Sequence, residues 1–250
     1  MQVIILCGGK GSRLRSENDT LPKPLALVNG KPLIWHIINI YRNFGYKEFI
    51  LPLGYGGDMI KEYFYNYEWK NSDFTLDYSK GERKLHKNFE DWKVTLVDTG
   101  INTMTGARIK KIEKYITQDD FMLTYGDGLS DININSLVKY HKEKGRIATV
   151  TGILKNSQYG VMEIKQGIAT NFREKSSAIG IINGGFFVLN RKVFNYLKDE
   201  DSCIFEEEPL NTLASLGELA VYEHHGFWLA VDTYKDLLEA NKSWGGNKLL

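Results

Sequence analysis

Short apolar runs alternate with amphipathic stretches along the first half of the chain. Strands are predicted over residues 2–6, 48–53 and 120–125, with two strand-like pieces near 73–78 and 93–98. Between them, residues 33–43, 58–67 and 106–117 place apolar side chains at helical spacing and predict helices. This β–α alternation predicts an α/β fold with a Rossmann-like, mainly parallel sheet and helices on both faces.

The second half of the chain has a different pattern, because strand-like runs crowd together with glycines between them. These runs cover residues 147–154, 160–164, 168–175 and 182–189, and helical patterns return near 205–215 and 233–244. Since the sequence contains no internal repeat and no linker, we expect residues 1–250 to form one domain with a small β-rich part. Ligands of open α/β sheets lie beyond the carboxyl ends of the strands, so the loops after residues 7, 98 and 125 should meet at one site.

Composition and charge exclude several classes of protein. Apolar residues make up 42% of the 250 residues and charged residues 25%, which is typical of a globular chain. A net charge of +1, from 32 basic and 31 acidic residues, argues against broad binding of nucleic acid or an anionic membrane. The two cysteines, Cys7 and Cys203, exclude a disulfide framework and a four-cysteine zinc site. No apolar run approaches the roughly 18 residues that span a bilayer, and residues 3–6 predict a buried strand rather than a signal peptide, so a cytoplasmic protein is expected.

The first candidate for chemistry is the glycine-rich turn after the first strand. Gly8, Gly9 and Gly11 let the backbone approach a ligand closely and direct its N–H groups toward anions. The alternative is a plain tight turn, but Arg13 favours binding of phosphate oxygens. Lys23, flanked by two prolines, is by itself an ordinary surface lysine, yet with Arg13 it suggests a pair of phosphate-contacting cations.

Two aspartates follow apolar runs and are candidates for a metal site. Asp127 lies between two glycines after the strand 120–125, and Asp232 precedes the helix predicted near 233–244. Mg²⁺ commonly takes one or two protein carboxylates plus phosphate oxygens. The alternatives are a turn aspartate at 127 and a helix N-cap at 232. On spacing alone, we interpret Glu174-Lys175 as an exposed charged pair and residues 183–187 as a strand with a glycine bulge.

These segments, in this order, resemble the sugar-nucleotidyltransferase family, and most closely its glucose-1-phosphate cytidylyltransferase branch. The resemblance rests on LCGGKGSRL (6–14), PKP (22–24), GKPLIWHI (30–37), GYGGDMIKEYF (54–64), VTLVDTG (94–100), TGARIKKI (105–112), TYGDG (124–128), NGGFFVLN (183–190) and GFW…DT (226–233). The segment VTLVDTG, with Met104-Thr105-Gly106 downstream, is typical of the cytidylyl branch rather than the thymidylyl or uridylyl one.

The resemblance implies an activity and a division of the chain. It implies a nucleotidyltransferase fold in which residues 1–135 mainly bind the nucleotide and residues 136–250 mainly bind the acceptor. It also implies that CMP is transferred from CTP to the phosphate of a small phosphorylated acceptor, with Mg²⁺ as cofactor and pyrophosphate as product. A homo-oligomer is expected, with no nucleic-acid and no membrane partner.

The resemblance further implies a set of site residues. The implied nucleotide-binding residues are Leu6, Cys7, Gly8, Gly9, Gly11, Ser12, Arg13, Lys23, Thr105, Gly106, Arg108, Tyr125 and Gly126. The implied acceptor-binding residues are Tyr159, Gly160, Arg173, Glu174, Lys175, Asn183, Gly184 and Trp228. The implied catalytic residues are Arg13, Lys23, Asp127, Lys175 and Asp232, of which the two aspartates hold Mg²⁺.

The acceptor half departs from the glucose-specific pattern. Ser176 stands where the family has proline, Leu229-Ala230-Val231 where the glucose branch has Gln-Pro-Met, and Arg173 where that branch has a neutral polar residue. The sequence is similar to capsule-biosynthesis enzymes that make CDP-L-glutamine, so L-glutamine phosphate is the favoured acceptor. Arg173 would meet its carboxylate, and Glu163 or Glu174 its ammonium. The alternative acceptor is glucose 1-phosphate, giving CDP-glucose, and a non-catalytic nucleotide sensor is the remote third hypothesis.

Overall fold

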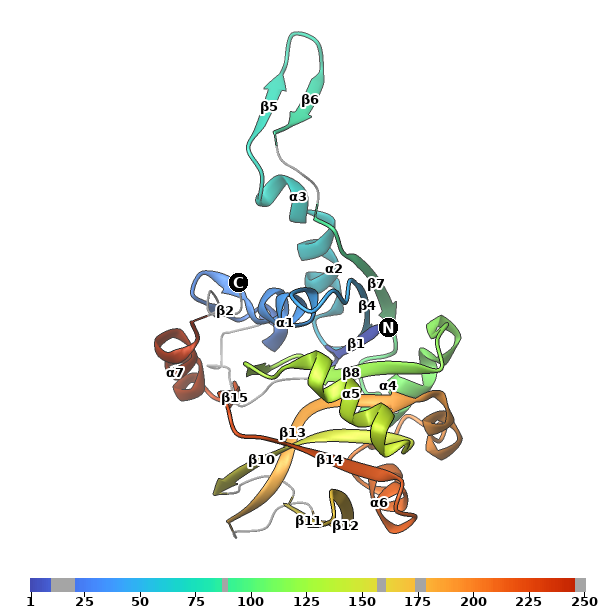
Figure 1. Ribbon diagram of the computed structural model, residues 1–250. Helices are drawn as coiled ribbons and strands as arrows, with labels where there is room; N and C mark the ends of the chain where they lie inside the picture. Colours follow the sequence, from blue (N-terminus) through green and yellow to red (C-terminus); the bar gives the residue numbers. More distant parts are fainter. Residues whose placement is uncertain (10–20, 87–89, 157–160, 174–178, 246–250) are drawn as a thin grey trace.

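The computed structural model describes residues 1–9, 21–86, 90–156, 161–173 and 179–245 (Figure 1). Its strands are β1 (Val3–Leu6), β2 (Leu27–Val28), β3 (Lys31–Pro32), β4 (Glu48–Leu53), β5 (Phe74–Asp77), β6 (Glu82–Leu85), β7 (Lys93–Asp98), β8 (Asp120–Tyr125), β9 (Gly128–Ser130), β10 (Ala148–Asn156), β11 (Val161–Lys165), β12 (Ile168–Arg173), β13 (Ile179–Asn190), β14 (Leu219–His224) and β15 (Trp228–Ala230). Its helices are α1 (Leu33–Arg42), α2 (Gly57–Tyr65), α3 (Tyr67–Lys70), α4 (Thr105–Lys111), α5 (Ile134–Lys144), α6 (Glu208–Ser215), α7 (Tyr234–Ser243) and the 3₁₀ turns η1 (Lys23–Leu25), η2 (Glu113–Tyr115) and η3 (Arg191–Tyr196). None of these described helices is both long and apolar enough to cross a bilayer.

One large sheet runs through the described part of the chain, in the order β10-β14-β12-β11-β13-β8-β1-β4-β7. Strands β8, β1, β4 and β7 pair in parallel, as expected for strands joined through helices. β13 pairs antiparallel with β8 and opens the β-rich part, in which pairing is mixed. The predicted α/β class, with a parallel sheet and a β-rich second part, is therefore confirmed, and both parts belong to one continuous sheet.

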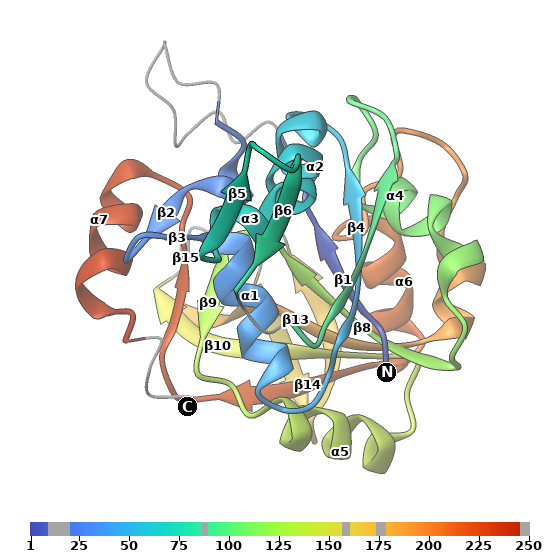
Figure 2. The ribbon, with the colours of Figure 1, turned by 90° about the horizontal axis from the view of Figure 1, so that it is seen from above.

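Strand β1, which lies between β8 and β4, is buried on both faces of this sheet. Its side chains alternate between two hydrophobic clusters, with Ile5 in one and Ile4 in the other. Helices α1 and α5 pack into the first cluster, and α4 and α6 pack into the second. The views in Figures 1 and 2 place these helices around the sheet. The predicted cover of helices on both faces is confirmed.

The sequence pattern did not predict α5, β9 or β14. Of the eleven residues of α5, only Ile134, Leu137, Val138 and His141 are buried, so its apolar stripe is sparse. Its ends are nevertheless marked: the Asn133 side chain accepts from Ser136 N, and Gly145 ends the helix at a positive φ of 59°. Two predicted helices are also shorter than expected, because 58–67 divides into α2 and α3, and 106–117 into α4 and η2.

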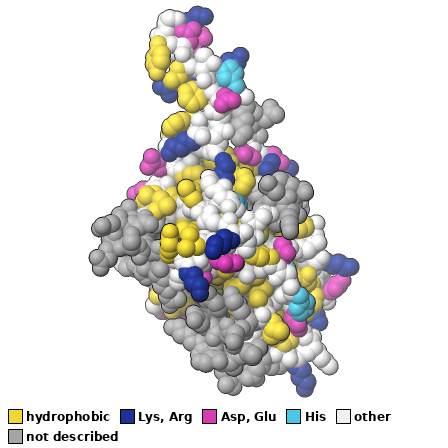
Figure 3. Space-filling view, turned by 90° about the vertical axis from the view of Figure 1, so that its left-hand side faces the viewer, with side chains coloured by type: hydrophobic (Ala, Val, Ile, Leu, Met, Phe, Trp, Pro, Cys, Tyr) yellow, Lys and Arg dark blue, Asp and Glu magenta, His cyan; other side chains and the backbone are white. Residues whose placement is uncertain are grey.

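The hairpin of β5 and β6 projects away from the rest of the molecule beyond α3 (Figure 1). Phe74 and Leu76 point to the same face of the hairpin because strand side chains alternate, and they are 43% and 40% exposed. Tyr78, at the turn, is 88% exposed. Figure 3 shows hydrophobic side chains on the surface of this projection. The hairpin therefore presents apolar side chains that the described part of the chain does not cover.

Candidate active site

Three loops that follow parallel strands meet at one edge of the sheet. β1 lies between β8 and β4, with Leu6 opposite Tyr125 and Cys7 opposite Leu53. A cleft of about 610 Å³, hereafter the first pocket, is lined by residues 6–9, 101–105 and 125–127 together with Lys23, Pro24, Arg108 and Asp232. The expectation that the loops after residues 7, 98 and 125 form one site is confirmed.

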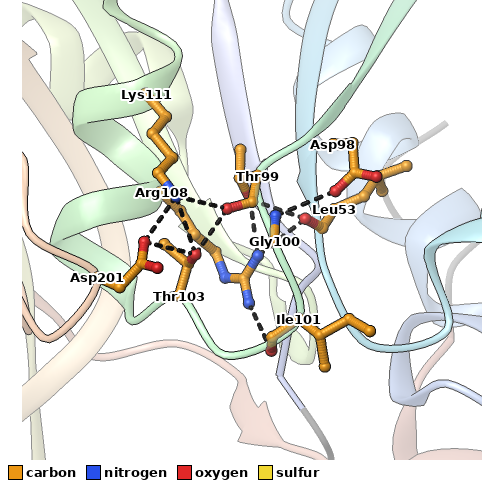
Figure 4. A network of polar contacts seen from close by, with 9 residues as sticks. All are labelled: Leu53, Asp98, Thr99, Gly100, Ile101, Thr103, Arg108, Lys111 and Asp201. Atoms are coloured by element: carbon orange, nitrogen blue, oxygen red, sulfur yellow. Dashed lines mark hydrogen bonds and ion pairs between the residues drawn. The ribbon is translucent and has the colours of Figure 1, made fainter.

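Arg108 is buried beside the first pocket, and its guanidinium joins the ends of β1, β4 and β7; Figure 4 shows its surroundings at the last two. It donates to the carbonyl oxygens of Leu53 at 2.8 Å, Gly8 at 3.1 Å and Ile101 at 3.3 Å, and to the hydroxyl of Thr99 at 2.6 Å. Arg108 is only 4% exposed, and this burial lowers its pKa. Because these partners are neutral oxygens from three separate loops, Arg108 fixes the loops relative to one another.

The position of the same guanidinium explains why residues 8 and 54 are glycines. A Cβ atom on Gly8 would lie 2.2 Å from Cζ of Arg108, and one on Gly54 would lie 2.4 Å from its Nη2. Both distances are far below van der Waals contact, so neither position has room for a side chain while Arg108 is in place. The sequence predicted that Gly8 lets a ligand approach the backbone, and that role stays a prediction.

A second layer of polar contacts holds the loop after β7 against α4 (Figure 4). Lys111 Nζ lies 2.6 Å from Asp201 Oδ1 and donates to the Thr99 carbonyl at 3.0 Å. The Thr103 hydroxyl lies 2.6 Å from the same carbonyl and 2.9 Å from Asp201 Oδ1. Hydrogen bonds from Lys111 and Thr103 lower the pKa of the Asp201 carboxyl. The loop that leads from β7 to Thr105, the first residue of α4, is thus supported from two sides.

Lys23 lies between the two predicted metal ligands. Its Nζ is 2.6 Å from Asp127 Oδ2 and 2.6 Å from Asp232 Oδ1. Burial by itself lowers the pKa of Lys23, but the two carboxylates outweigh burial and the net shift is upward. The ammonium is therefore charged at neutral pH. It joins Lys23 of η1 to Asp127, which follows β8, and to Asp232, which precedes α7.

The carboxylates beside Lys23 fit a divalent cation that shares its ligands with a substrate. Mg²⁺ is usually bound by one or two carboxylates, and phosphate oxygens and water complete its shell. Asp127 and Asp232, which both contact the Lys23 ammonium, supply those two carboxylates. Among the described residues, no group of three or more His, Cys, Asp or Glu side chains is close enough to hold a metal ion. The donor set thus matches a metal that phosphate oxygens help to coordinate.

A second pocket of about 200 Å³ opens beside the first and shares Tyr125, Asp127 and Asp232 with it. The remaining lining residues are Thr124, Gly128, Asn183, Gly184, Gly185, Glu206, Trp228 and Ala230. Trp228 Nε1 donates to the Gly184 carbonyl at 2.7 Å, which holds the indole against β13. Of the described residues that line this pocket, none is lysine, arginine or histidine.

Glu206 links the walls of the two pockets. Its Oε1 accepts from the Tyr125 hydroxyl at 2.5 Å, and its Oε2 accepts from the Thr105 hydroxyl at 2.5 Å. Asn183 Nδ2 donates to the Tyr125 oxygen at 3.1 Å. Burial and the Glu206 carboxylate raise the pKa of Tyr125 well above its usual value, so the phenol keeps its proton and donates it.

Sequence reasoning missed Glu206. It is the first of three consecutive glutamates, and such a run is typical of a solvated acidic segment. Its partners Thr105 and Tyr125 lie 101 and 81 residues away in the chain. No spacing rule links positions so far apart, so only the folded structure shows that Glu206 belongs to the site.

Most of the predicted site residues that the structure describes come together. Leu6, Cys7, Gly8, Gly9, Lys23, Thr105, Arg108, Tyr125 and Gly126 line the first pocket, and Gly106 follows Thr105 in α4. Asn183, Gly184 and Trp228 line the second pocket. Gly11, Ser12, Arg13, Tyr159, Gly160, Glu174 and Lys175 lie outside the described residues, and Arg173 ends β12 with its side chain outside them. The functional roles of all these residues stay predictions.

The structure also decides between some of the alternatives. The N-cap alternative for Asp232 is wrong, because the Thr233 side chain caps α7 in a capping box with Asp236. The glycine bulge expected in 183–187 is present: the register between β10 and β13 shifts between Val150 and Gly152, opposite these residues. Asn183 lines the second pocket at this irregularity, so the bulge and a place at the site are compatible.

Comparisons with known proteins agree with this arrangement. A family model described as "Nucleotidyl transferase" matches residues 2–245. "Probable glucose-1-phosphate cytidylyltransferase" of Bacillus subtilis (strain 168) is 54% identical over 244 residues, covering 98% of this chain and 96% of that protein. "Glucose-1-phosphate cytidylyltransferase" of Salmonella typhimurium is 43% identical over 251 residues, covering 99% of this chain and 97% of that protein.

Solved structures show the same fold at low sequence identity. HddC from Yersinia pseudotuberculosis, complexed with GMP-PN, superposes with a TM-score of 0.77 at 23% identity, covering 97% of this chain and 99% of that one. UTP-bound UGPase from Acinetobacter baumannii superposes with a TM-score of 0.78 at 17% identity, covering 98% and 93%. At such identities the likeness concerns the fold alone.

Proposed function

The chain belongs to the nucleotidyl transferase family, and from that membership we propose that it transfers CMP from CTP to the phosphate of glucose 1-phosphate, releasing pyrophosphate. The choice of CTP is supported by two relatives, 54% and 43% identical, whose names specify glucose-1-phosphate cytidylyltransferase. Those names also favour glucose 1-phosphate over L-glutamine phosphate. The acceptor proposed here is therefore the one that the sequence alone ranked second.

The observation that supports this acceptor best is the polar character of the second pocket. Its described lining offers a carboxylate at Glu206, an amide at Asn183 and an indole at Trp228, but no lysine, arginine or histidine. A hexose presents neutral hydroxyls and an apolar ring face, which match hydrogen-bond acceptors and an aromatic wall.

The proposed reaction needs positioning and charge neutralisation more than proton transfer. An oxygen of the acceptor's phosphate attacks the α-phosphorus of CTP in line, and pyrophosphate leaves. That phosphate is already anionic near pH 7, because its second pKa is about 6, so no general base is required. The first pocket would hold CTP and the second pocket the acceptor, so that the two phosphates meet where Asp127 and Asp232 border both.

We assign the electrostatic work to Lys23, to the two aspartates and, from the sequence, to Arg13 and Lys175. Lys23 stays charged at the junction of the pockets, and once a divalent cation takes up the two carboxylates its ammonium would be available to the phosphates of either substrate. Asp127 and Asp232 would hold a divalent cation, proposed to be Mg²⁺, which neutralises phosphate charge when bound. Arg13 and Lys175 are proposed to contact the triphosphate and the acceptor phosphate respectively.

Pyrophosphate release with CTP and Mg²⁺ tests the proposal directly. The acceptor panel contains glucose 1-phosphate, L-glutamine phosphate, phosphocholine and other sugar phosphates. Release with glucose 1-phosphate alone is expected. Release with L-glutamine phosphate alone would overturn the acceptor and favour an enzyme that makes CDP-L-glutamine. Binding of CTP without release on any acceptor would favour a non-catalytic nucleotide sensor.

We also propose that the protein is a homo-oligomer, with the β5–β6 hairpin as a contact between subunits. An isolated two-stranded hairpin is marginally stable in water, and this one exposes Phe74 and Leu76 on one face. Sedimentation analysis is the test: Leu76→Lys should weaken the assembly, whereas Thr75→Lys, on the opposite face, should not. A monomeric wild-type protein would contradict the proposal.

A further inference from the structure

Glu206 has hydrogen-bonding capacity that the residues described in the structure leave unused. Each carboxylate oxygen offers about two lone-pair positions. Tyr125 occupies one on Oε1 and Thr105 occupies one on Oε2. Among the described residues, no lysine or arginine forms an ion pair with Glu206, although its carboxylate lines the second pocket. Roughly half of its accepting capacity is therefore available to a ligand in that pocket.

The neighbouring groups are short of hydrogens to donate. The Tyr125 hydroxyl gives its only proton to Glu206 and accepts from Asn183. The Trp228 N–H is committed to the Gly184 carbonyl. The polar lining thus offers more acceptors than donors, and a ligand that supplies hydrogens satisfies it better than one that supplies lone pairs.

The charges along the second pocket determine which end of the acceptor faces Glu206. A phosphate dianion is repelled by the Glu206 carboxylate, whereas at the other end of the pocket the Lys23 ammonium, together with a divalent cation that Asp127 and Asp232 would hold, would attract it. The end of the acceptor that carries hydroxyl groups then turns toward Glu206. Thr105 and Tyr125 hold the carboxylate from two sides, so its lone pairs have fixed directions before the ligand arrives.

We propose that Glu206 determines acceptor specificity by accepting hydrogen bonds from one or more hydroxyl groups of the acceptor's sugar ring. This inference rests on the proposed function and adds the residue that recognises the sugar. The ligand class is a hydroxylated sugar 1-phosphate, and the recognised feature is a ring hydroxyl rather than the phosphate. A hydroxyl that donates to a carboxylate contributes more to binding than one that meets a neutral acceptor.

The test crosses one enzyme variant with a set of substrate analogues. Monodeoxy analogues of glucose 1-phosphate, each lacking one ring hydroxyl, are compared in kcat/KM with wild-type enzyme and with Glu206→Gln. In wild type, loss of the recognised hydroxyl should lower kcat/KM by about 10- to 100-fold. In Glu206→Gln, the same loss should cost less than about threefold, because the charged acceptor is already gone.

Two further variants separate recognition from folding. Glu206→Asp keeps the charge, but its side chain is shorter by one methylene and holds the carboxylate farther from the ligand. It should therefore also lose the discrimination between glucose 1-phosphate and the deoxy analogue. Glu207→Gln, at the exposed neighbouring residue, should keep the wild-type pattern. Glu207→Gln should also leave the KM for CTP unchanged, because the described lining of the first pocket does not include Glu207. Glu206 holds Thr105 in the wall of the first pocket, so a weaker grip on CTP in its variants would lower kcat/KM for every analogue alike, and the ratio between analogues remains the readout of recognition.

Two outcomes would overturn the inference, and they differ. If wild type turns over glucose 1-phosphate but Glu206→Gln shows the same deoxy penalties as wild type, Glu206 does not recognise a hydroxyl and the proposed function still stands. If wild type releases no pyrophosphate with any sugar 1-phosphate, both the proposed function and the role of Glu206 fail.

Discussion

The two pockets of the site are built from different kinds of contact. Around the first pocket, Arg108 bonds to backbone carbonyls at the ends of three loops. Around the second pocket, a chain of side-chain contacts runs from Asn183 through Tyr125 to Glu206, beside one bond from Trp228 to a backbone carbonyl. Backbone carbonyls are the same whatever the residue, whereas a side-chain network changes with every substitution.

This difference suggests how each pocket is specified. The shape of the first pocket depends on one buried guanidinium and on the absence of side chains at two glycines, so few substitutions are compatible with it. The second pocket depends on polar side chains that contact one another, so substitutions among them can change its ligand preference while the sheet stays intact. The departures at 173–176 and 229–231 fall in the half of the sequence that contributes most of the second pocket.

The largest effect is expected at a residue that the two pockets share. Asp127→Asn should lower kcat by about 10²–10³-fold, because it removes one of the two carboxylates proposed to hold the divalent cation that neutralises both phosphates. Steady-state pyrophosphate release measures this loss. Asp58→Asn, whose side chain is 98% exposed at the start of α2, should behave as wild type. Full activity of Asp127→Asn in Mg²⁺ would remove this residue from the reaction.

The next largest effect should be confined to the first pocket. Arg108→Met removes the four hydrogen bonds that the buried guanidinium donates and should cost roughly 3 kcal/mol of unfolding free energy, together with a higher KM for CTP. Thermal unfolding should shift down by roughly 10 °C for a chain of this size. Arg42→Met, which breaks a partly exposed ion pair with Asp91, should cost less than about 1 kcal/mol. Equal losses in the two variants would contradict a special role for Arg108.

A smaller effect should be confined to the second pocket. Asn183→Ala removes the amide that donates to Tyr125 and should raise the KM of the acceptor about tenfold, with the KM of CTP unchanged. Asn211→Ala, on the exposed face of α6, is the matched control. If Asn183→Ala raised both KM values equally, the two pockets would not be separable.

The smallest effect should come from a single hydrogen bond of the pocket wall. Trp228→Phe keeps an aromatic wall but removes the N–H that donates to the Gly184 carbonyl, a bond of about 1 kcal/mol. We expect the KM of the acceptor to rise roughly fivefold. A rise of 100-fold or more would mean that the indole N–H does more than hold the wall.

The sequence predicted the parallel part of the fold better than the site between its loops. Apolar runs such as 2–6 and 120–125 are buried on both faces, so their pattern is strong and their strands were found almost to the residue. The sequence also predicted that the loops after residues 7, 98 and 125 meet, because parallel strands end at one edge. The helix α5 was not predicted because its buried residues are too sparse to make a clear stripe.

The finer chemistry depends on contacts between distant parts of the chain. The sequence placed Arg108 among the residues that bind the nucleotide, but nothing in its spacing shows that its guanidinium bonds to Gly8, Leu53 and Thr99. Glu206 was not singled out at all, because a run of glutamates favours a solvated surface. Both residues act through partners that only tertiary folding brings near.

The space that Arg108 shares with Gly8 and Gly54 has a consequence for how this sequence can evolve. A Cβ at either glycine would collide with the guanidinium, at 2.2 Å and 2.4 Å. The guanidinium is the far end of a long side chain, so alanine at residue 8 or 54 forces it to move and to give up hydrogen bonds unless the arginine has already been replaced. The cost of a substitution at one of the three positions therefore depends on the residues at the other two, and the order in which such substitutions accumulate matters.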